Sequence, residues 1–117
     1  MNVKNKRHLT RKPLKIEARY QDLNRKVLKG TVRNIGIGGV YIETPHTLEL
    51  GEIIRIILDV IDEGRIIYVE GKVVHCEPEK GMGIEFTDQD NREIKKLIST
   101  MRKQDQTSLL TLSKSAF

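Results

Sequence analysis

Apolar and polar residues alternate with a period of two along most of the chain, which is typical of strands that bury one face. The first such stretch, residues 14–20, is expected to bury four side chains: Leu14, Ile16, Ala18 and Tyr20. Further strand-like runs, separated by short turns, cover residues 27–33, 40–44, 53–60, 65–76 and 81–86. Strands and turns at this regular spacing predict a mainly β fold, a small antiparallel barrel of six or seven strands.

Two of these runs carry additional information. Residues 53–60 are apolar at nearly every position, which predicts a strand buried on both faces or covered by a neighbour. Residues 65–76 contain Gly71, and a glycine inside a strand predicts a bulge or bend there. Gly64 lies in the turn between the two runs, where a hairpin requires a residue that tolerates positive φ.

The period changes after residue 87, where apolar residues recur at helical spacing. Asp88 is a candidate N-cap for a helix over residues 88–102. Its apolar stripe is expected to pack across the barrel or its open end and consists of Ile94, Leu97, Ile98 and Met101. The predicted organisation is therefore a flexible basic arm (1–12), a barrel with a C-terminal helix (13–103) and a disordered tail (104–117).

The composition fits one globular domain of 117 residues with a cytoplasmic location. No apolar run approaches the roughly 20 residues that a membrane-spanning helix needs, and the basic N-terminus does not resemble a secretory signal. Cys76 is the single cysteine, so an internal disulfide is excluded.

Positive charge is concentrated at the start of the chain. Residues 1–33 contain eleven Lys or Arg and two acidic residues, whereas the remainder contains ten and fourteen. A basic N-terminal third indicates an anionic partner, such as a nucleotide, a nucleic acid or a lipid headgroup. A nucleic-acid-binding barrel is disfavoured, because only Tyr20 and Tyr41 could provide stacking surfaces near the basic end.

Candidate catalytic and metal-binding residues do not form a recognisable arrangement. His8, His46 and His75 are scattered, and they show no metal-ligand spacing with Cys76. The serines lie in the helix or the tail without a matching His and acid. The sequence therefore indicates a binding protein that is neither an enzyme nor a metalloprotein.

The turn Asn34-Ile-Gly36-Ile-Gly38-Gly39 joins two strand-like runs. Glycine tolerates positive φ and lets another group approach the main chain closely, so this turn is expected to expose its backbone to a ligand. A simple hairpin loop, shaped by its glycines, is the alternative interpretation.

Upstream, Arg7 and Arg11 form an Arg-x-x-x-Arg pair, which precedes Asn34-x-Gly36-x-x-Gly39. Together these motifs resemble the signature of the PilZ domain, a bacterial module that binds cyclic di-GMP. That family has Asp or Asn-x-Ser-x-x-Gly after its second strand, so Gly36 departs from the pattern at the serine position. Leu50-Gly51-Glu52 and the segment 81–86 also resemble the family, and the resemblance covers roughly residues 5 to 102.

The resemblance implies a PilZ-type β-barrel that binds cyclic di-GMP and signals through a ligand-dependent interaction with an effector protein. The implied ligand-binding residues are Arg7, Arg11, Asn34, Gly36, Gly38 and Gly39. Arginine can bind phosphate bidentately or pair with guanine, and asparagine presents a donor and an acceptor to a guanine edge. Arg33 is a weaker candidate, because alternation points it away from Asn34. A PilZ-like adaptor that binds no nucleotide is the alternative, since Gly36 lacks the hydroxyl.

Overall fold

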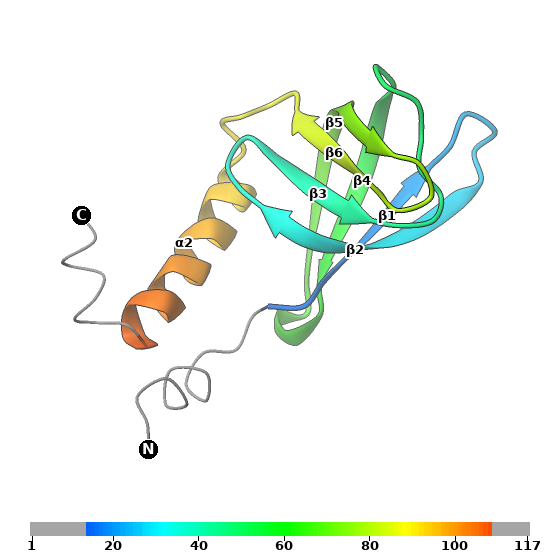
Figure 1. Ribbon diagram of the computed structural model, residues 1–117. Coiled ribbons are helices and arrows are strands. Elements are labelled where there is room, and N and C mark those ends of the chain that lie inside the picture. Colours follow the sequence, from blue (N-terminus) through cyan, green and yellow to red (C-terminus); the bar gives the residue numbers. More distant parts are fainter. Residues whose placement is uncertain (1–13, 109–117) are drawn as a thin grey trace.

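The computed structural model describes residues 14–108, which fold into a six-stranded barrel followed by a helix (Figure 1). The strands are β1 (Ile16–Gln21), β2 (Val27–Ile35), β3 (Gly39–Glu43), β4 (Ile53–Val60), β5 (Arg65–Glu77) and β6 (Gly81–Phe86). A short 3-10 helix, η1 (Ile61–Glu63), joins β4 to β5, and the helix α2 (Arg92–Ser108) follows β6. The predicted mainly β fold, with an antiparallel barrel and a C-terminal helix, is confirmed.

The barrel closes because β1 pairs with two neighbours. The strand order around the ring is β1-β2-β3-β6-β5-β4, and all pairs are antiparallel. Tyr20 on β1 lies opposite Leu28 on β2 and opposite Ile56 on β4. Since both sides of every strand are hydrogen-bonded, no strand of the barrel presents a free edge.

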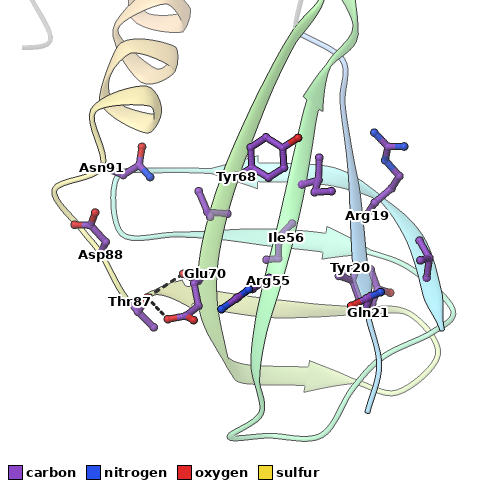
Figure 2. A pocket seen from close by; sticks show the side chains of 13 residues that line it. Arg19, Tyr20, Gln21, Arg55, Ile56, Tyr68, Glu70, Thr87, Asp88 and Asn91 are labelled. Carbon is purple, nitrogen blue, oxygen red and sulfur yellow. Dashed lines mark hydrogen bonds between the residues drawn. The ribbon is translucent and has the colours of Figure 1, made fainter. Parts of the chain in front are cut away.

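The core fills the inside of the barrel with alternate side chains from each strand. On β4 these are Ile54, Ile56, Leu58 and Val60, all buried. Of the two alternatives expected for residues 53–60, burial on both faces is wrong, because Ile53 is 55% exposed and Arg55 points outward. The edges of β4 are covered by its neighbours β1 and β5. Figure 2 shows the outer face of this part of the barrel, with Ile56 and Arg55 on successive positions of β4.

Helix α2 packs its apolar stripe onto the barrel. Ile94, Leu97 and Ile98 are buried in the same cluster as the barrel interior, and Met101 packs against that cluster, as predicted. Within residues 14–108, no helix has the length and apolar character that would let it cross a lipid bilayer.

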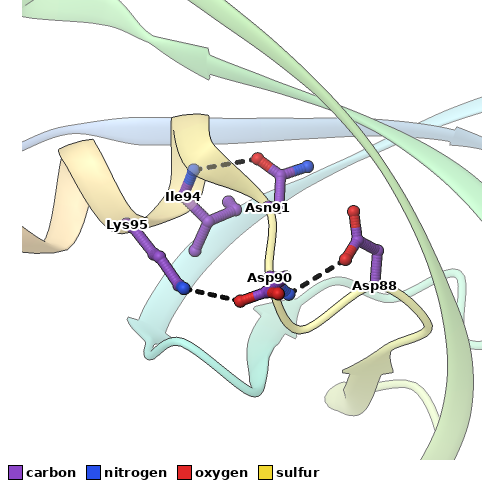
Figure 3. A network of polar contacts seen from close by, with 5 residues as sticks. All are labelled: Asp88, Asp90, Asn91, Ile94 and Lys95. Carbon is purple, nitrogen blue, oxygen red and sulfur yellow. Dashed lines mark hydrogen bonds and ion pairs between the residues drawn. The ribbon is translucent and has the colours of Figure 1, made fainter.

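The ends of α2 differ from the prediction. Asn91 caps the helix, because its Oδ1 accepts a hydrogen bond from the N–H of Ile94 at 3.0 Å (Figure 3). Asp88 was the wrong N-cap: its carboxylate accepts from the N–H of Asp90 instead, at 2.9 Å. The helix continues to Ser108, so residues 104–108 of the expected tail are helical. The expected arm (1–12) and the remaining tail (109–117) lie outside the described residues.

One buried polar network ties the strands together at one end of the barrel. The hydroxyl of Tyr20 on β1 lies 2.8 Å from Oγ1 of Thr44 and 2.7 Å from the carbonyl oxygen of His46, so it can donate to either. Thr44 donates its own hydroxyl hydrogen to the carbonyl of Lys29 on β2 at 3.0 Å, and it accepts from the N–H of His46. Burial raises the pKa of the Tyr20 hydroxyl, which stays protonated as the donor.

We expect Thr44→Val to lower the free energy of unfolding by roughly 1–3 kcal/mol, because it leaves buried donors and acceptors without partners. Thr31→Val is the matched control: Thr31 is exposed on β2, and the same exchange there should change stability by less than about 0.5 kcal/mol. Urea unfolding of both variants measures the difference. Equal stabilities would show that the network does not stabilise the fold.

Candidate functional site

A β-bulge places Asn34 on the outer surface of the barrel. The pairing of β2 with β3 shifts register between Val32 and Asn34, so Arg33 is the extra residue. Regular alternation would turn Asn34 inward, but the bulge leaves both Arg33 and Asn34 exposed and turns Ile35 toward the core. The prediction that Arg33 points away from Asn34 was therefore wrong.

The glycine turn after Asn34 is tight. The N–H of Gly36 donates to the carbonyl of Gly39 at 2.9 Å, which leaves Ile37 and Gly38 as the loop. None of the three glycines of this turn adopts a positive φ. At Gly39 glycine is required for another reason: a Cβ there would overlap the backbone carbonyl oxygen of Ile84 on β6. The group that comes close to the main chain at Gly39 is therefore the neighbouring strand β6.

Four strands align a row of residues on the outer face beside this turn. Asn34 on β2 lies opposite Tyr41 on β3, Tyr41 lies opposite Gly83 on β6, and Gly83 lies opposite His75 on β5. Since Gly83 has no side chain, the middle of this row is backbone and the side chains stand on either side of it. The row forms one part of an open groove.

The groove has a volume of about 560 Å³ and is hereafter the glycine groove. It contains four of the residues that the sequence predicted for a ligand site: Asn34, Gly36, Gly38 and Gly39. Its other lining side chains include Tyr41, Val74, Glu85 and Gln89. This volume lies within the range of about 300–1,000 Å³ that is usual for small-molecule sites.

A second bulge supplies the far wall of the glycine groove. The pairing of β5 with β6 shifts register between Val73 and His75, so Val74 is the extra residue and is 50% exposed. The predicted bulge at Gly71 was therefore three residues too early. Gly71 is needed for close packing, because a Cβ there would overlap the side chain of Ile84 and lie 2.9 Å from the carbonyl oxygen of Glu85.

Tyr41 lies over two glycines of β6. A Cβ on Gly81 would overlap its ring, and one on Gly83 would lie 4.0 Å from its Cδ1. Its hydroxyl donates to the carboxylate of Glu77, and this hydrogen bond to an anion is the main cause that raises the pKa of Tyr41 to about 12. At neutral pH the tyrosine is therefore a protonated donor fixed on the outer face.

The described part of the glycine groove lacks positive charge. Its lining residues among 14–101 include the carboxylate of Glu85 and no Lys or Arg. The nearby Arg33 is already engaged, since its Nη2 lies 2.5 Å from the carboxylate of Glu43. An anionic ligand would need cations from elsewhere. The two arginines that the sequence predicted for the site, Arg7 and Arg11, lie outside the described residues.

Segment 87–91 borders the glycine groove and connects β6 to α2. The side-chain amide of Gln89 would lie 3.8 Å from a Cβ on Gly38, and the carbonyl of Gly38 accepts from the N–H of Phe86 at 2.9 Å. Lys95 lies 2.6 Å from the carboxylate of Asp90 and lowers the pKa of that group (Figure 3). The segment is thus held to the first turn of α2.

Sequence reasoning did not identify several residues of the site: Tyr41, Val74, Gly83, Glu85 and Gln89. The spacing of Gly81 and Gly83 was an available signal, because residues two apart share one face of a strand. Two glycines on the outward face predict a strip of bare backbone. No cluster of three or more potential metal ligands occurs within the part of the chain that the structure describes.

A family model matches most of this chain, and solved structures share its fold. The family model described as PilZ domain matches residues 4–103. A comparison with curated protein sequences gave no match. Among solved structures, the PilZ domain with c-di-GMP of YcgR from Escherichia coli superposes with a TM-score of 0.67 at 11% identity, covering 87% of this chain and 94% of that one.

Two further structures share the fold. The PilZ domain of CeSA from a cellulose-synthesizing bacterium has a TM-score of 0.57 at 14% identity and covers 79% of this chain and 97% of that one. The Bacillus subtilis inhibitor of motility (MotI/DgrA) has a TM-score of 0.65 at 20% identity and covers 84% of this chain. This chain spans half the length of MotI/DgrA.

We expect Gly39→Ala to destabilise the fold by roughly 1–3 kcal/mol or more, because the new methyl group forces β3 away from the backbone of β6. Gly36→Ala is the matched control: no atom lies within 4 Å of its Cβ position, and its φ is not in the left-handed region. Thermal unfolding of the two variants tests this difference. Similar melting temperatures would show that β3 and β6 can move apart without a loss of stability.

Proposed function

The chain belongs to the PilZ domain family, and from this premise we propose that it is a receptor for cyclic di-GMP that signals through a ligand-dependent contact with an effector protein. The observation that carries the proposal is the glycine groove, which gathers Asn34, Gly36, Gly38 and Gly39 on one outer face. The structural relative YcgR is described with c-di-GMP, which supports the choice of ligand.

Recognition of the nucleotide follows from the chemistry of these residues. The amide of Asn34 offers a donor and an acceptor to the edge of a guanine, and the bulge at Arg33 holds that amide outward. The glycines leave room for the base above the backbone. Val74 and the ring of Tyr41 provide apolar surface at the sides of the groove.

The two phosphates require positive charge that the described lining does not supply. Arg7 and Arg11 precede β1 on a basic segment, and guanidinium groups bind phosphate oxygens bidentately. In the proposed mechanism this arm closes over the ligand and becomes ordered when it does so. The closed arm then changes the surface that an effector protein contacts.

An adaptor that binds no nucleotide is the second candidate, and two observations favour it. Gly36 lacks the hydroxyl of the family motif, and the carboxylate of Glu85 in the groove repels phosphate. Under this alternative the protein acts through protein contacts alone. Calorimetric titration with cyclic di-GMP, with GTP as the control nucleotide, separates the two candidates.

We expect the protein to bind cyclic di-GMP at low micromolar affinity or tighter, and Arg7→Ala and Arg11→Ala each to weaken binding about ten- to hundredfold. Each change removes charge-assisted hydrogen bonds worth roughly 1.5–3 kcal/mol. Lys4→Ala is the matched control, since it removes one positive charge of the same segment outside the motif. Calorimetry measures the affinities. An equal loss in all three variants would indicate non-specific attraction, and no heat with the wild type would favour the adaptor.

We expect Gly36→Ser to tighten cyclic di-GMP binding about two- to tenfold, because a neutral hydrogen bond contributes roughly 0.5–1.5 kcal/mol. The structure permits the substitution, since the φ of Gly36 is not in the left-handed region and its Cβ position is open. Gly36→Ala separates the causes by calorimetry. If Gly36→Ala gains as much affinity as Gly36→Ser, reduced flexibility of the turn is the cause. If both variants lose affinity, the ligand needs glycine at this position.

A further inference from the structure

A second groove lies on the outer face of β1, β4 and β5, and its volume is about 600 Å³ (Figure 2). We call it the β1/β4/β5 groove. It is separate from the glycine groove, whose strand residues come from β2, β3, β5 and β6. Thr87, Asp88 and Asn91, in the segment that leads to α2, form one wall. The proposed nucleotide mechanism does not use this surface.

The floor of the β1/β4/β5 groove is apolar. Ile57 on β4 and Tyr68 on β5 are cross-strand partners, and Tyr68 is 70% exposed. Ile66, two residues earlier on the same face of β5, is 48% exposed and extends the apolar surface beyond the groove lining. Exposed aromatic and aliphatic side chains that adjoin one another on a concave surface are typical of protein docking sites.

One end of this floor is positively charged. Arg19 on β1 lies opposite Ile57 on one side and opposite Lys29 on the other. Like charges directly opposite each other destabilise a sheet, and an acidic partner would relieve the repulsion. Arg55 lines the same groove, but it lies opposite the carboxylate of Glu70 in the sheet. No ion pair to Arg19 or Lys29 is found among residues 14–101.

The two carboxylates of the groove are bonded within the protein. Glu70 accepts from the hydroxyl of Thr87 at 3.0 Å (Figure 2), and Asp88 accepts from the N–H of Asp90. A carboxylate that accepts one hydrogen bond keeps its charge, and Glu70 also lies opposite Arg55, so Arg19 and Lys29 are the cations left to pair with a ligand. Arg19 and Ile57 lie on adjacent strands, about 5 Å apart in the sheet. That spacing matches side chains one turn apart on a helix.

We propose that the β1/β4/β5 groove docks an acidic amphipathic helix of a partner protein. An apolar side chain of the helix packs on Ile57 and Tyr68, and a carboxylate one turn away pairs with Arg19 and Lys29. Cyclic di-GMP controls this docking through segment 87–91, a part that rests on the proposed function. Gln89 of that segment lines the glycine groove, whereas Thr87 and Asp88 line the docking groove.

Selection of a random dodecapeptide phage library on the full chain tests the docking surface. We expect the enriched peptides to combine a large apolar residue with Asp or Glu three or four positions away. A synthetic peptide of that sequence should bind the Tyr68→Ser and Arg19→Glu variants at least tenfold more weakly than it binds the wild-type protein. Exchange of its acids for Lys should restore binding to Arg19→Glu. Matched controls outside the groove are Leu23→Ser, at a position 84% exposed, and Lys80→Glu; both should bind as the wild type does.

Three results would overturn the docking proposal: no enrichment, enrichment of basic peptides, or equal binding by Tyr68→Ser and the wild type. Sedimentation of the protein alone is the further check, since self-association that Tyr68→Ser abolishes would assign the groove to a second copy of this chain.

The control by nucleotide is measured separately, as the affinity of the same peptide with and without saturating cyclic di-GMP. We expect a change of at least about fivefold, the lower end of usual coupling between sites. If calorimetry shows that the nucleotide binds but the peptide affinity does not change, the coupling through segment 87–91 is wrong. If the nucleotide does not bind, the proposed function fails while peptide binding to the groove still supports the docking surface.

Discussion

Closure of the barrel is the constraint on which the rest of the structure depends. Because β1 pairs with both β2 and β4, every strand has two neighbours and the register around the ring is fixed. The interior is filled by side chains, including the stripe of α2 that covers it. Recognition is therefore restricted to the outer face and the loops. Both grooves lie there, on different parts of the same closed sheet, and β5 contributes to each.

Within that fixed register, two bulges decide which residues reach the surface. The extra residue Arg33 turns Asn34 outward, and the extra residue Val74 raises a wall on the other side of β3 and β6. Between them, Gly39 and Gly83 keep the backbone bare. The glycine groove is thus a consequence of irregular pairing in an otherwise regular sheet, together with glycines placed where strands approach closely.

Segment 87–91 connects these surfaces. At one end of the segment, the hydroxyl of Thr87 donates to the carboxylate of Glu70. At the other end, the segment is held by the Asn91 cap and by the ion pair between Asp90 and Lys95. The exposed hydrogen bond of Thr87 and the exposed ion pair contribute little to stability individually, which makes the segment easier to rearrange than the barrel. A ligand at the glycine groove would therefore act on this segment before it could distort a strand.

The sequence by itself determined the mainly β fold, the strand positions within a few residues and the helix stripe, because local periodicity reflects burial of one face. It also placed Asn34 and the glycines close together around one turn, although Asn34 belongs to β2 and Gly39 to β3. The tertiary structure alone decided the residues that join them, such as Tyr41 and Val74, and the outward direction of Asn34. Pairing between strands distant in sequence sets the bulges and the glycine contacts, and local patterns carry no information on such partners.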